Sequence, residues 1–356
     1  TMVSLAAFIQ LPMTSPSRFG PLSRKSSSRQ TALPSSVRFR DRSPCRQPRC
    51  VNGGIAGETS PANRSHRSLL NCDVLIDEFD KLARIHNKWT FSQSAGNQFA
   101  RVPETILWDG SLPTGEDTSN WVFKPVYSRF ASRTLIDPPA STVAKLTPTE
   151  RERWVAQRRI RGQEYSTYSV AIRGRLVAHV VYPSLYRAGL GSGICFRSVK
   201  QPAIDDFVTE FVQAENYTGQ IGFDLIIDSD GDGWVIEGNP RATSGAQLFA
   251  STDRLSDRLL QRQQFEDVLT PSSRRPVMIE LAMPFWGLID AFRPGTLLRF
   301  LPDLLRSRWT ILSLTDPWPA LAMPRTLWEI ALVARRERRT LQQASTFDIE
   351  WNGEAM

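Results

Sequence analysis

Cysteine and histidine are scarce in this chain. Its 356 residues include four Cys and three His. No two cysteines form a CxxC pair, so neither a disulfide framework nor a zinc site is expected. The three histidines, His66, His86 and His179, are dispersed along the sequence, which argues against His-based catalysis.

Long apolar runs are also absent from the sequence. No stretch of about twenty apolar residues occurs, so no transmembrane segment is expected. The segment 276–335 is rich in Leu, Trp and Pro but is interrupted by arginines. This pattern is typical of short amphipathic helices, which either pack against the rest of the fold or lie on a membrane surface.

Positive charge is concentrated near the start of the sequence. The chain has a formal net charge of +8, and residues 1–70 hold eleven Lys or Arg against two acidic residues, Asp41 and Glu58. That segment therefore carries +9 and the remainder −1. Because the remainder is nearly neutral, we expect no nucleic-acid partner.

Residues 1–70 are rich in Ser, Pro and Arg and show little periodicity, so we expect a disordered basic tail. Three interpretations stay open. The tail is an organellar transit peptide, a basic arm for an acidic partner, or sequence that does not belong to the fold. We favour the third interpretation, and we expect a cytoplasmic location.

A β-hairpin with polar residues on one face is predicted over 221–240. Two apolar, β-branched segments flank an Asp- and Gly-rich turn. Side chains alternate across a strand, so Glu237 and Asn239 share a face. If the register pairs Asp224 with that face, three oxygen-bearing side chains converge. The alternative is a half-exposed hairpin with ordinary surface charges.

Carboxylates between apolar strands are costly to bury unless a cation neutralises them. Oxygen ligands without Cys or His suit Mg²⁺, which usually binds together with phosphate groups. The hairpin therefore favours a metal–nucleotide enzyme.

The turn itself, 228–233, matches the start of a calcium loop of the form DxDxDG. An EF-hand also needs flanking helices and a Glu at the twelfth position, where this chain has Asn239. A polar hairpin turn is the better interpretation.

Two lysines support the metal–nucleotide interpretation. Lys124 lies inside the short apolar segment 121–126, where a cation is rare without an anionic partner. Lys88 lies where one predicted helix ends and the next begins. The alternative is that both side chains are solvated, with Lys124 on an edge strand.

The middle of the chain is predicted to be mostly β. A capping box at 147–150 predicts a helix that begins near residue 148 and gives way to a strand at 155–160. A hairpin is predicted over 165–182. The Gly-rich segment 188–194 precedes no helix pattern, so we interpret it as a connection and not as a phosphate loop.

The order of five motifs resembles the ATP-grasp superfamily, including carbamoyl phosphate synthetase and the carboxylate–amine ligases. These motifs extend over roughly 88–250 and are Asn87-Lys88, Phe123-Lys124-Pro125, Gln157–Ile160 with Gly162–Glu164, Gly222–Asp224, and Glu237–Arg241. The resemblance implies an α+β fold in which two α+β subdomains clamp ATP. It also implies an N-terminal α/β domain, and residues 1–70 lack the strand–helix alternation of such a domain.

The division of the chain that we expect follows from this resemblance. It comprises the disordered basic tail 1–70, a helical lead-in 71–100, a small subdomain with a lid 101–160, a large subdomain with the metal site 161–250, and a mainly helical region 251–356.

The resemblance also implies roles for single residues. Lys88 and Lys124 would contact phosphates, and Glu164 would bind the ribose. The hinge that reads adenine would consist of Gln157, Arg158, Arg159 and Ile160. Asp224, Glu237 and Asn239 would hold Mg²⁺ or Mn²⁺, with Asp224 standing where many relatives have Glu or Gln. Arg241 would stabilise the transferring phosphoryl group or the substrate, and Arg129, Arg133 and Arg197 are further candidates near the site.

The function that these roles imply is an ATP- and Mg²⁺-dependent ligase that activates a carboxylate as an acylphosphate and joins it to an amine. Its partners would be small-molecule carboxylates and amines. The alternative is a nucleotide-binding protein with impaired turnover because the N-terminal domain is lacking.

Overall fold

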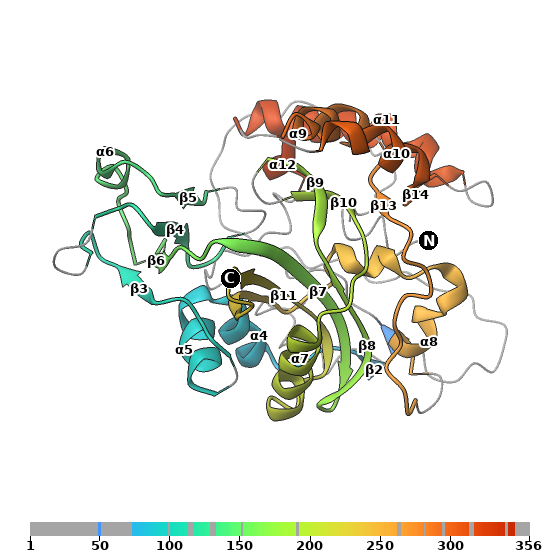
Figure 1. The fold of residues 1–356 in the computed structure, drawn as a ribbon, viewed down its shortest axis with the longest axis horizontal. Helices are drawn as coiled ribbons and strands as arrows, with labels where there is room; N and C mark the ends of the chain where they lie inside the picture. Colours follow the sequence, from blue (N-terminus) through green and yellow to red (C-terminus); the bar gives the residue numbers. More distant parts are fainter. Residues whose placement is uncertain are drawn as a thin grey trace, which may run out of the picture.

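The computed structural model describes residues 49–50, 73–98, 100–112, 117–128, 133–150, 152–189, 192–261, 265–280, 282–293, 296–312, 317–338 and 341–345. The expected tail 1–70 lies outside these ranges except for strand β1, Arg49–Cys50, which pairs in parallel with β2, Asp73–Val74. The α+β class expected from the sequence is confirmed, because helices and antiparallel sheets alternate along the described chain (Figure 1).

Two helices, α4 (Phe79–His86) and α5 (Lys88–Gln98), precede the first sheet. Asn87 separates them because its side-chain oxygen accepts hydrogen bonds from the backbone N–H groups of Trp89 (3.0 Å) and Thr90 (3.1 Å). This is an N-cap, so α5 begins at Lys88 for a local reason. The cap fixes where the Lys88 side chain leaves the helix.

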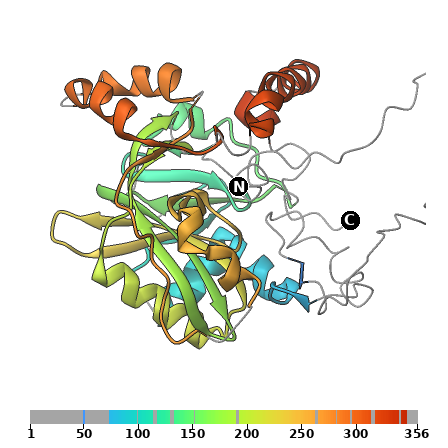
Figure 2. The ribbon, with the colours of Figure 1, turned by 90° about the vertical axis from the view of Figure 1, so that its right-hand side faces the viewer.

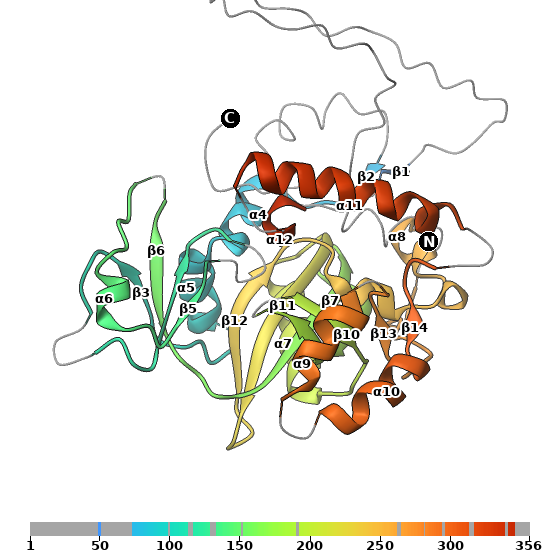
Figure 3. The same ribbon diagram turned by 90° about the horizontal axis from the view of Figure 1, so that it is seen from above.

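The smaller sheet has the strand order β3-β6-β4-β5, and every pairing in it is antiparallel. Its strands are β3 (Thr105–Trp108), β4 (Trp121–Pro125), β5 (Leu135–Ile136) and β6 (Trp154–Arg158). Buried aromatic side chains, including Trp121 and Phe123, give this sheet a core of its own. The sheet projects from the rest of the molecule (Figures 1 and 3).

The prediction of a helix that begins near residue 148 is wrong. A short helix, α6 (Ala140–Val143), lies earlier, and residues 146–149 are not helical. Thr149 and Glu152 instead exchange backbone hydrogen bonds of 3.1 Å in each direction. The segment 149–153 offers no apolar stripe, and a short helix without tertiary packing is marginal. The following residues, which pair as β6 between β3 and β4, therefore decide the local structure.

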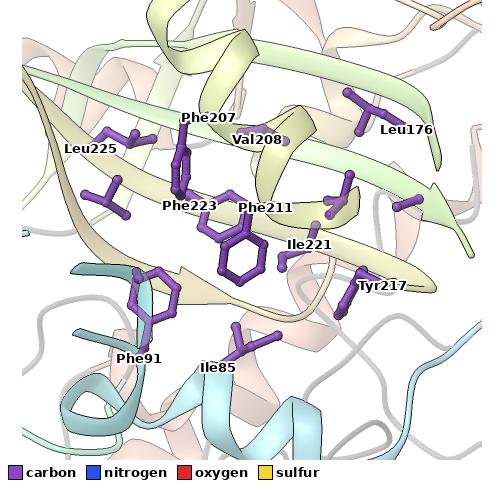
Figure 4. Packing of buried hydrophobic residues seen from close by; sticks show 14 of the residues in the cluster. Ile85, Phe91, Leu176, Phe207, Val208, Phe211, Tyr217, Ile221, Phe223 and Leu225 are labelled. Carbon is purple, nitrogen blue, oxygen red and sulfur yellow. The ribbon is translucent and has the colours of Figure 1, made fainter. Parts of the chain in front are cut away.

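The larger sheet has the order β12-β11-β7-β8 and is also antiparallel. Its strands are β7 (Gly162–Ile172), β8 (Arg175–Tyr182), β11 (Gly219–Asp228) and β12 (Gly233–Asn239). Helix α7 (Pro202–Ala214) packs on one face, together with α4 and α5. Figure 4 shows Phe207 and Phe211 of α7 and Phe91 of α5 around Phe223 of β11. Because Phe223 points to these helices, Asp224 points to the opposite face.

Gly238 lets the two lead-in helices approach β12 closely. A Cβ atom at this position would lie 2.8 Å from Ile85 Cγ2 and 2.9 Å from Phe91 Cε2. Both neighbours are fully buried, so neither can move into solvent. Gly238 therefore packs against the hydrophobic core on one face of β12, while Glu237 and Asn239 point to the opposite face.

We expect Gly238→Ala to destabilise the fold by about 1–3 kcal/mol through overpacking. Urea denaturation followed by circular dichroism would measure this loss. Gly231→Ala is the matched control for general glycine loss, because Gly231 lies in the exposed turn with no atom within 4 Å of an added Cβ. Since Gly231 has φ +87°, its own cost would reflect backbone strain and not packing. Equal denaturation midpoints for Gly238→Ala and the parent chain would contradict the packing argument.

The C-terminal region is mainly helical, as expected. It follows η2 (Ser244–Leu248) and contains η3 (Ser251–Asp253), α8 (Leu255–Leu259), the π-helical turn η4 (Met283–Gly287), α9 (Leu288–Ala291), α10 (Leu297–Arg306), α11 (Trp318–Arg336) and α12 (Leu341–Ala344). Two short strands, β13 (Val277–Met278) and β14 (Arg308–Trp309), join β9 (Ser184–Ala188) and β10 (Ser192–Phe196) in a third sheet. Within the described part of the chain, no helix has the length and apolar character needed to cross a membrane.

Candidate functional site

A cavity of about 490 Å³ is lined by residues of all three four-stranded sheets and by Lys88 of α5. The small sheet contributes Lys124 and Gln157, and the large sheet contributes Asp224, Glu237 and Asn239. Every residue to which the resemblance gave a definite role in binding or catalysis lines this cavity, and the further candidates Arg129, Arg133 and Arg197 are treated below. The geometry of each one is described below.

The three oxygen-bearing side chains lie together. Asp224 of β11 is directly opposite Glu237 of β12, and Asn239 lies two residues further along β12. The amide nitrogen of Asn239 is 3.1 Å from Asp224 Oδ2 and 3.5 Å from Glu237 Oε1. On the other side, Ser166 of β7 donates to Asp224 Oδ1 at 2.6 Å. The pairing register on which the sequence argument depended is therefore the observed one.

A β-bulge accompanies this cluster. The register shifts between Asp224 and Leu225, so Ile236 is the extra residue on β12. A bulge turns consecutive side chains toward the same side of a strand. Ile236 and Glu237 accordingly both line the cavity, which places an apolar side chain beside the carboxylate.

Two buried lysines face the carboxylates. The Lys88 ammonium lies 3.3 Å from Glu237 Oε2 and donates to the Ser128 carbonyl oxygen at 3.0 Å. The Lys124 ammonium donates to Gln157 Oε1 at 2.9 Å. Both lysine residues are only 4% exposed, so the alternative of solvated side chains is wrong.

Gln157 has a different position from the one its predicted role requires. Its side chain is buried, accepts from Lys124, and donates to Thr105 Oγ1 at 2.9 Å. Its backbone lies in a central strand, paired with β3 on one side and β4 on the other. Gln157 therefore orients Lys124, because two strands already occupy the backbone that an adenine ring would need.

The next two residues of the predicted hinge are also partly engaged in the fold. The backbone N–H groups of Arg158 and Arg159 donate to the carbonyl oxygens of Glu104 and Asn120, both at 2.7 Å. The Arg158 side chain covers the Trp121 ring at 4.5 Å, and the Arg159 side chain pairs with Asp137. Ile160 lines the cavity just after β6. Of the four predicted hinge residues, it is the one best placed to contact an adenine ring.

The pKa values of the two facing carboxylates, Asp224 and Glu237, are shifted in opposite directions. Burial alone would raise the pKa of Glu237, but the ammonium groups of Lys88 and Lys124 outweigh it and lower that pKa to about 2. Burial, reinforced by the Glu237 charge, raises the pKa of Asp224 to about 7. Burial also lowers the pKa of Lys124 to about 8 against the attraction of Glu237. One carboxylate is thus neutralised by two lysines, whereas the Arg241 charge does not outweigh the burial of the other.

This donor set fits a divalent cation. Two facing carboxylates with an amide between them offer oxygen ligands, and one of the carboxylates is short of positive charge. Among the described residues, no group of three or more His, Cys, Asp or Glu side chains could hold a metal. The set is therefore not a complete protein cage, and water or phosphate oxygens would supply the remaining ligands, as is usual for Mg²⁺.

Asn239 and Arg241 form a linked pair. Arg241 Nη2 donates to Asn239 Oδ1 at 2.9 Å, so the amide presents its nitrogen to the carboxylates and its oxygen to the arginine. The oxygen that the sequence argument assigned to a metal is thus turned away, because the N–H₂ group donates to the Asp224 carboxylate while the oxygen accepts from Arg241. Arg241 Nε is buried and has no hydrogen-bond partner within the described part of the structure. A buried cationic donor of this kind favours an anionic ligand beside it.

Arg187 was missed by the sequence argument. It lies on β9, lines the cavity, and its Nη1 is 2.7 Å from Glu164 Oε2. Asp290 accepts a 3.1 Å hydrogen bond from its backbone N–H. The available signal was an arginine in the strand that follows Pro183, where the chain leaves β8.

Other candidate arginines lie elsewhere. Arg133 pairs with Glu152 and lies over the Trp154 ring at 5.1 Å, and neither partner lines the cavity. Arg197 is exposed and does not line the cavity. Arg129 lies outside the described residues. The Gly-rich segment connects β9 and β10, and its described residues 188–189 and 192–194 do not begin a helix.

The Asp-rich turn has a structural explanation. The Asp228 carboxylate accepts hydrogen bonds from the backbone N–H groups of Asp230 (3.0 Å) and Asp232 (2.9 Å) and from the Trp234 indole (2.7 Å). One aspartate therefore closes the turn by itself, which agrees with the polar-turn interpretation.

A Ser–His–Asp chain occurs away from the cavity. Ser169 Oγ is 2.8 Å from His179 Nδ1, and His179 Nε2 is 3.1 Å from Asp205 Oδ1. Ser169 is fully buried, so no substrate carbonyl can reach its hydroxyl. The arrangement satisfies the hydrogen-bonding groups of buried side chains between β7, β8 and α7.

No protein-family model and no curated protein sequence matches the chain. Solved structures do match it. They include an L-amino acid ligase from Bacillus licheniformis (20% identity, 51% of this chain and 46% of that chain, TM-score 0.39). A putative ATP-grasp superfamily protein from Archaeoglobus fulgidus also matches (15% identity, 60% of this chain and 63% of that chain, TM-score 0.39).

D-alanine–D-alanine ligase from Bacillus anthracis, solved with ATP, is a third match (16% identity, 52% of this chain and 65% of that chain, TM-score 0.38). The chain spans less than two thirds of the length of each of these three proteins. At this level of similarity, the chemistry of the cavity follows from its own residues.

Proposed function

We propose that this chain is an ATP-grasp ligase, which uses ATP and Mg²⁺ or Mn²⁺ to activate a carboxylate and join it to an amine. One observation carries the proposal: Asp224 and Glu237 face each other on adjacent strands, and two buried lysines line the same cavity from different elements. Oxygen ligands on one side and cations on the other suit a metal-bound polyphosphate.

The residues would divide the work by position. Asp224 and Glu237 would hold the cation, and Asn239 would join them after its amide turns over and releases Arg241. The bound cation would offset phosphate charge. Because the Asp224 side chain is short, water would supply part of the ligands that the cation needs there. Lys88 and Lys124 would bind phosphate oxygens, with Gln157 holding Lys124 in place.

The nucleoside would lie toward the rim of the same cavity. Ile160 would pack on the adenine ring, and Glu164 would bind the ribose hydroxyls. Arg187 already pairs with Glu164, so it would fix the orientation of that carboxylate.

The reaction would proceed in two steps. A substrate carboxylate oxygen attacks the γ-phosphorus of ATP and ADP leaves, which gives an acylphosphate. The amine nitrogen then attacks the acyl carbon, phosphate leaves, and the nitrogen loses a proton. Arg241, with its unsatisfied Nε, would stabilise charge on the transferring group.

We also propose bounds for the two subdomains, the class of partners and the cellular location. Residues 101–160 would form the small subdomain and its lid, and residues 161–250 the large one. The partners would be small-molecule carboxylates and amines, without nucleic acid, in the cytoplasm.

A phosphate-release screen tests the function. The full chain is incubated with ATP and Mg²⁺ against panels of amino acids and small carboxylic acids, with and without amines. We expect phosphate release that depends on one class of carboxylate and stops when EDTA removes the metal. Hydroxylamine should trap the acylphosphate as a hydroxamate. Nucleotide binding without phosphate release across the panel would favour the binding-protein alternative, and a chain that binds no nucleotide would refute both.

A further inference from the structure

The described part of the chain exposes large apolar side chains at one place. Of the 19 exposed large hydrophobic residues, 17 lie between residues 285 and 341. Water-soluble monomers rarely expose a contiguous apolar patch of more than a few hundred Å². A concentration of this kind in one segment therefore indicates an interaction surface.

These side chains form stripes on three helical segments. Phe285, Ile289 and Phe292 follow one another on η4 and α9, with 68%, 70% and 72% exposure. Leu298, Leu301 and Leu305 do the same on α10, and Trp318, Leu321, Trp328 and Leu332 on α11. The spacing of three, four or seven residues keeps each set on one helix face.

The three segments lie at the same end of the molecule. Figures 1 and 2, which differ by a quarter turn about the vertical axis, both place α9, α10 and α11 at the top. Figure 3 looks down on this end and shows α11 along one side of it and α9 with α10 along the other. We call the exposed apolar side chains of 285–341 the apolar end surface.

Acidic side chains on these segments have partners within the described part of the protein, whereas several basic side chains do not. The carboxylates are held by the protein: Asp290 accepts from the Arg187 backbone, and Asp303 from the Tyr186 hydroxyl at 3.0 Å. On α11 and its cap, Glu329 and Glu337 pair with Arg325 and Arg336.

Arginines on the same segments remain available to a partner. Arg306, Arg335 and Arg338 are exposed, and no carboxylate of the described residues lies within ion-pair distance of them. These three arginines lie at the C-terminal end of α10 and at or just beyond the C-terminal end of α11, and we call them the arginine rim.

We propose that the apolar end surface binds an anionic lipid bilayer, with α9, α10 and α11 lying in the plane of the membrane. Leucine and phenylalanine side chains would enter the acyl boundary, and the arginines would meet lipid phosphates. Four exposed tryptophans, Trp286, Trp309, Trp318 and Trp328, suit the headgroup level. Because no described helix can cross a membrane, binding would be peripheral. The proposal does not depend on the ligase function.

A second copy of the chain would fit this surface less well. In a two-fold interface the same patch faces itself, so the arginine rims of two copies would meet. Like charges in such an interface cost free energy. An anionic lipid surface satisfies both the apolar stripes and the rim.

Vesicle co-sedimentation tests the proposal. The full chain is mixed with phosphatidylcholine vesicles, with and without phosphatidylserine, at low and high salt. We expect binding to the anionic vesicles that weakens in salt. The double substitution Leu298→Glu with Leu305→Glu should reduce partitioning roughly tenfold or more, because two side chains no longer leave water. Arg335→Glu with Arg338→Glu should reduce binding to the anionic vesicles only.

Val268→Glu is the matched control, because Val268 is 42% exposed but lies outside the apolar end surface. It should bind vesicles as the parent chain does, and circular dichroism should show that all variants are folded. Failure of the folded parent chain to bind anionic vesicles would overturn the proposal. A dimer seen by sedimentation velocity, abolished by the same leucine substitutions and without vesicle binding, would overturn it in favour of self-association.

Discussion

Glu237→Gln is expected to lower Mg-ATP turnover by about a thousandfold, because it removes the carboxylate shared by the metal set and the lysines. The amide keeps the size of the side chain, so the bulge and the strand register should persist. Lys88 loses its ion-pair partner at 3.3 Å, and Lys124 loses the charge that opposes its burial. Single-turnover phosphate release, with the carboxylate found in the screen, measures the loss.

The same substitution should also destabilise the protein without ligand by about 3 kcal/mol. Removing one partner of a buried ion pair leaves its counter-charge uncompensated, and here two ammonium groups share that partner. Chemical denaturation measures this term separately from turnover. Asp230→Asn is the matched control, since Asp230 is an exposed carboxylate in the hairpin turn of the same strands. A variant with parental turnover would show that the cluster does not hold the catalytic metal.

Lys124→Met is expected to weaken nucleotide affinity about a hundredfold while leaving the melting temperature of the ligand-free protein almost unchanged. The first effect follows from the loss of a charge-assisted contact worth about 2–3 kcal/mol. The second is expected because the burial that lowers the pKa of Lys124 offsets its favourable contacts with Glu237 and Gln157 in the ligand-free protein. Isothermal titration with a non-hydrolysable ATP analogue and thermal denaturation would measure the two effects.

Lys145→Met provides the control for losing a lysine from the same part of the chain, because Lys145 is exposed after α6. It should change neither quantity. If Lys124→Met instead lowered the melting temperature strongly and left affinity unchanged, Lys124 would have a structural role only.

The sequence predicted the parts of this protein that depend on strand periodicity. Alternation placed Glu237 and Asn239 on one face, and the register then brought Asp224 to the same point. A lysine inside an apolar strand indicated a buried partner, and Lys124 is indeed buried close to Glu237. Such features follow from a period of two residues and from the cost of burying charge, both of which are local to the sequence.

Features that depend on tertiary pairing were not predictable in this way. The capping box near residue 148 gave no helix, because β6 pairs on both sides a few residues later. Gln157 looked like a hinge residue until its side chain was seen to hold Lys124. Arg187 reaches Glu164 only because the chain leaves β8 at Pro183 and returns over β7. The exposed stripes of α9–α11 were recognised as amphipathic, but the sequence did not show which face the fold would cover.

Lys88 gives the cavity a cation from outside both sheets. The lysine begins α5, whose position depends on Phe91 and Ile85 packing behind Gly238. A shortened chain that started at residue 101 would keep every strand of the β3-β6-β4-β5 and β12-β11-β7-β8 sheets and lose this cation. Anyone dividing the protein into fragments for expression or crystallisation should therefore cut before α4, although the strands alone would suggest a later boundary.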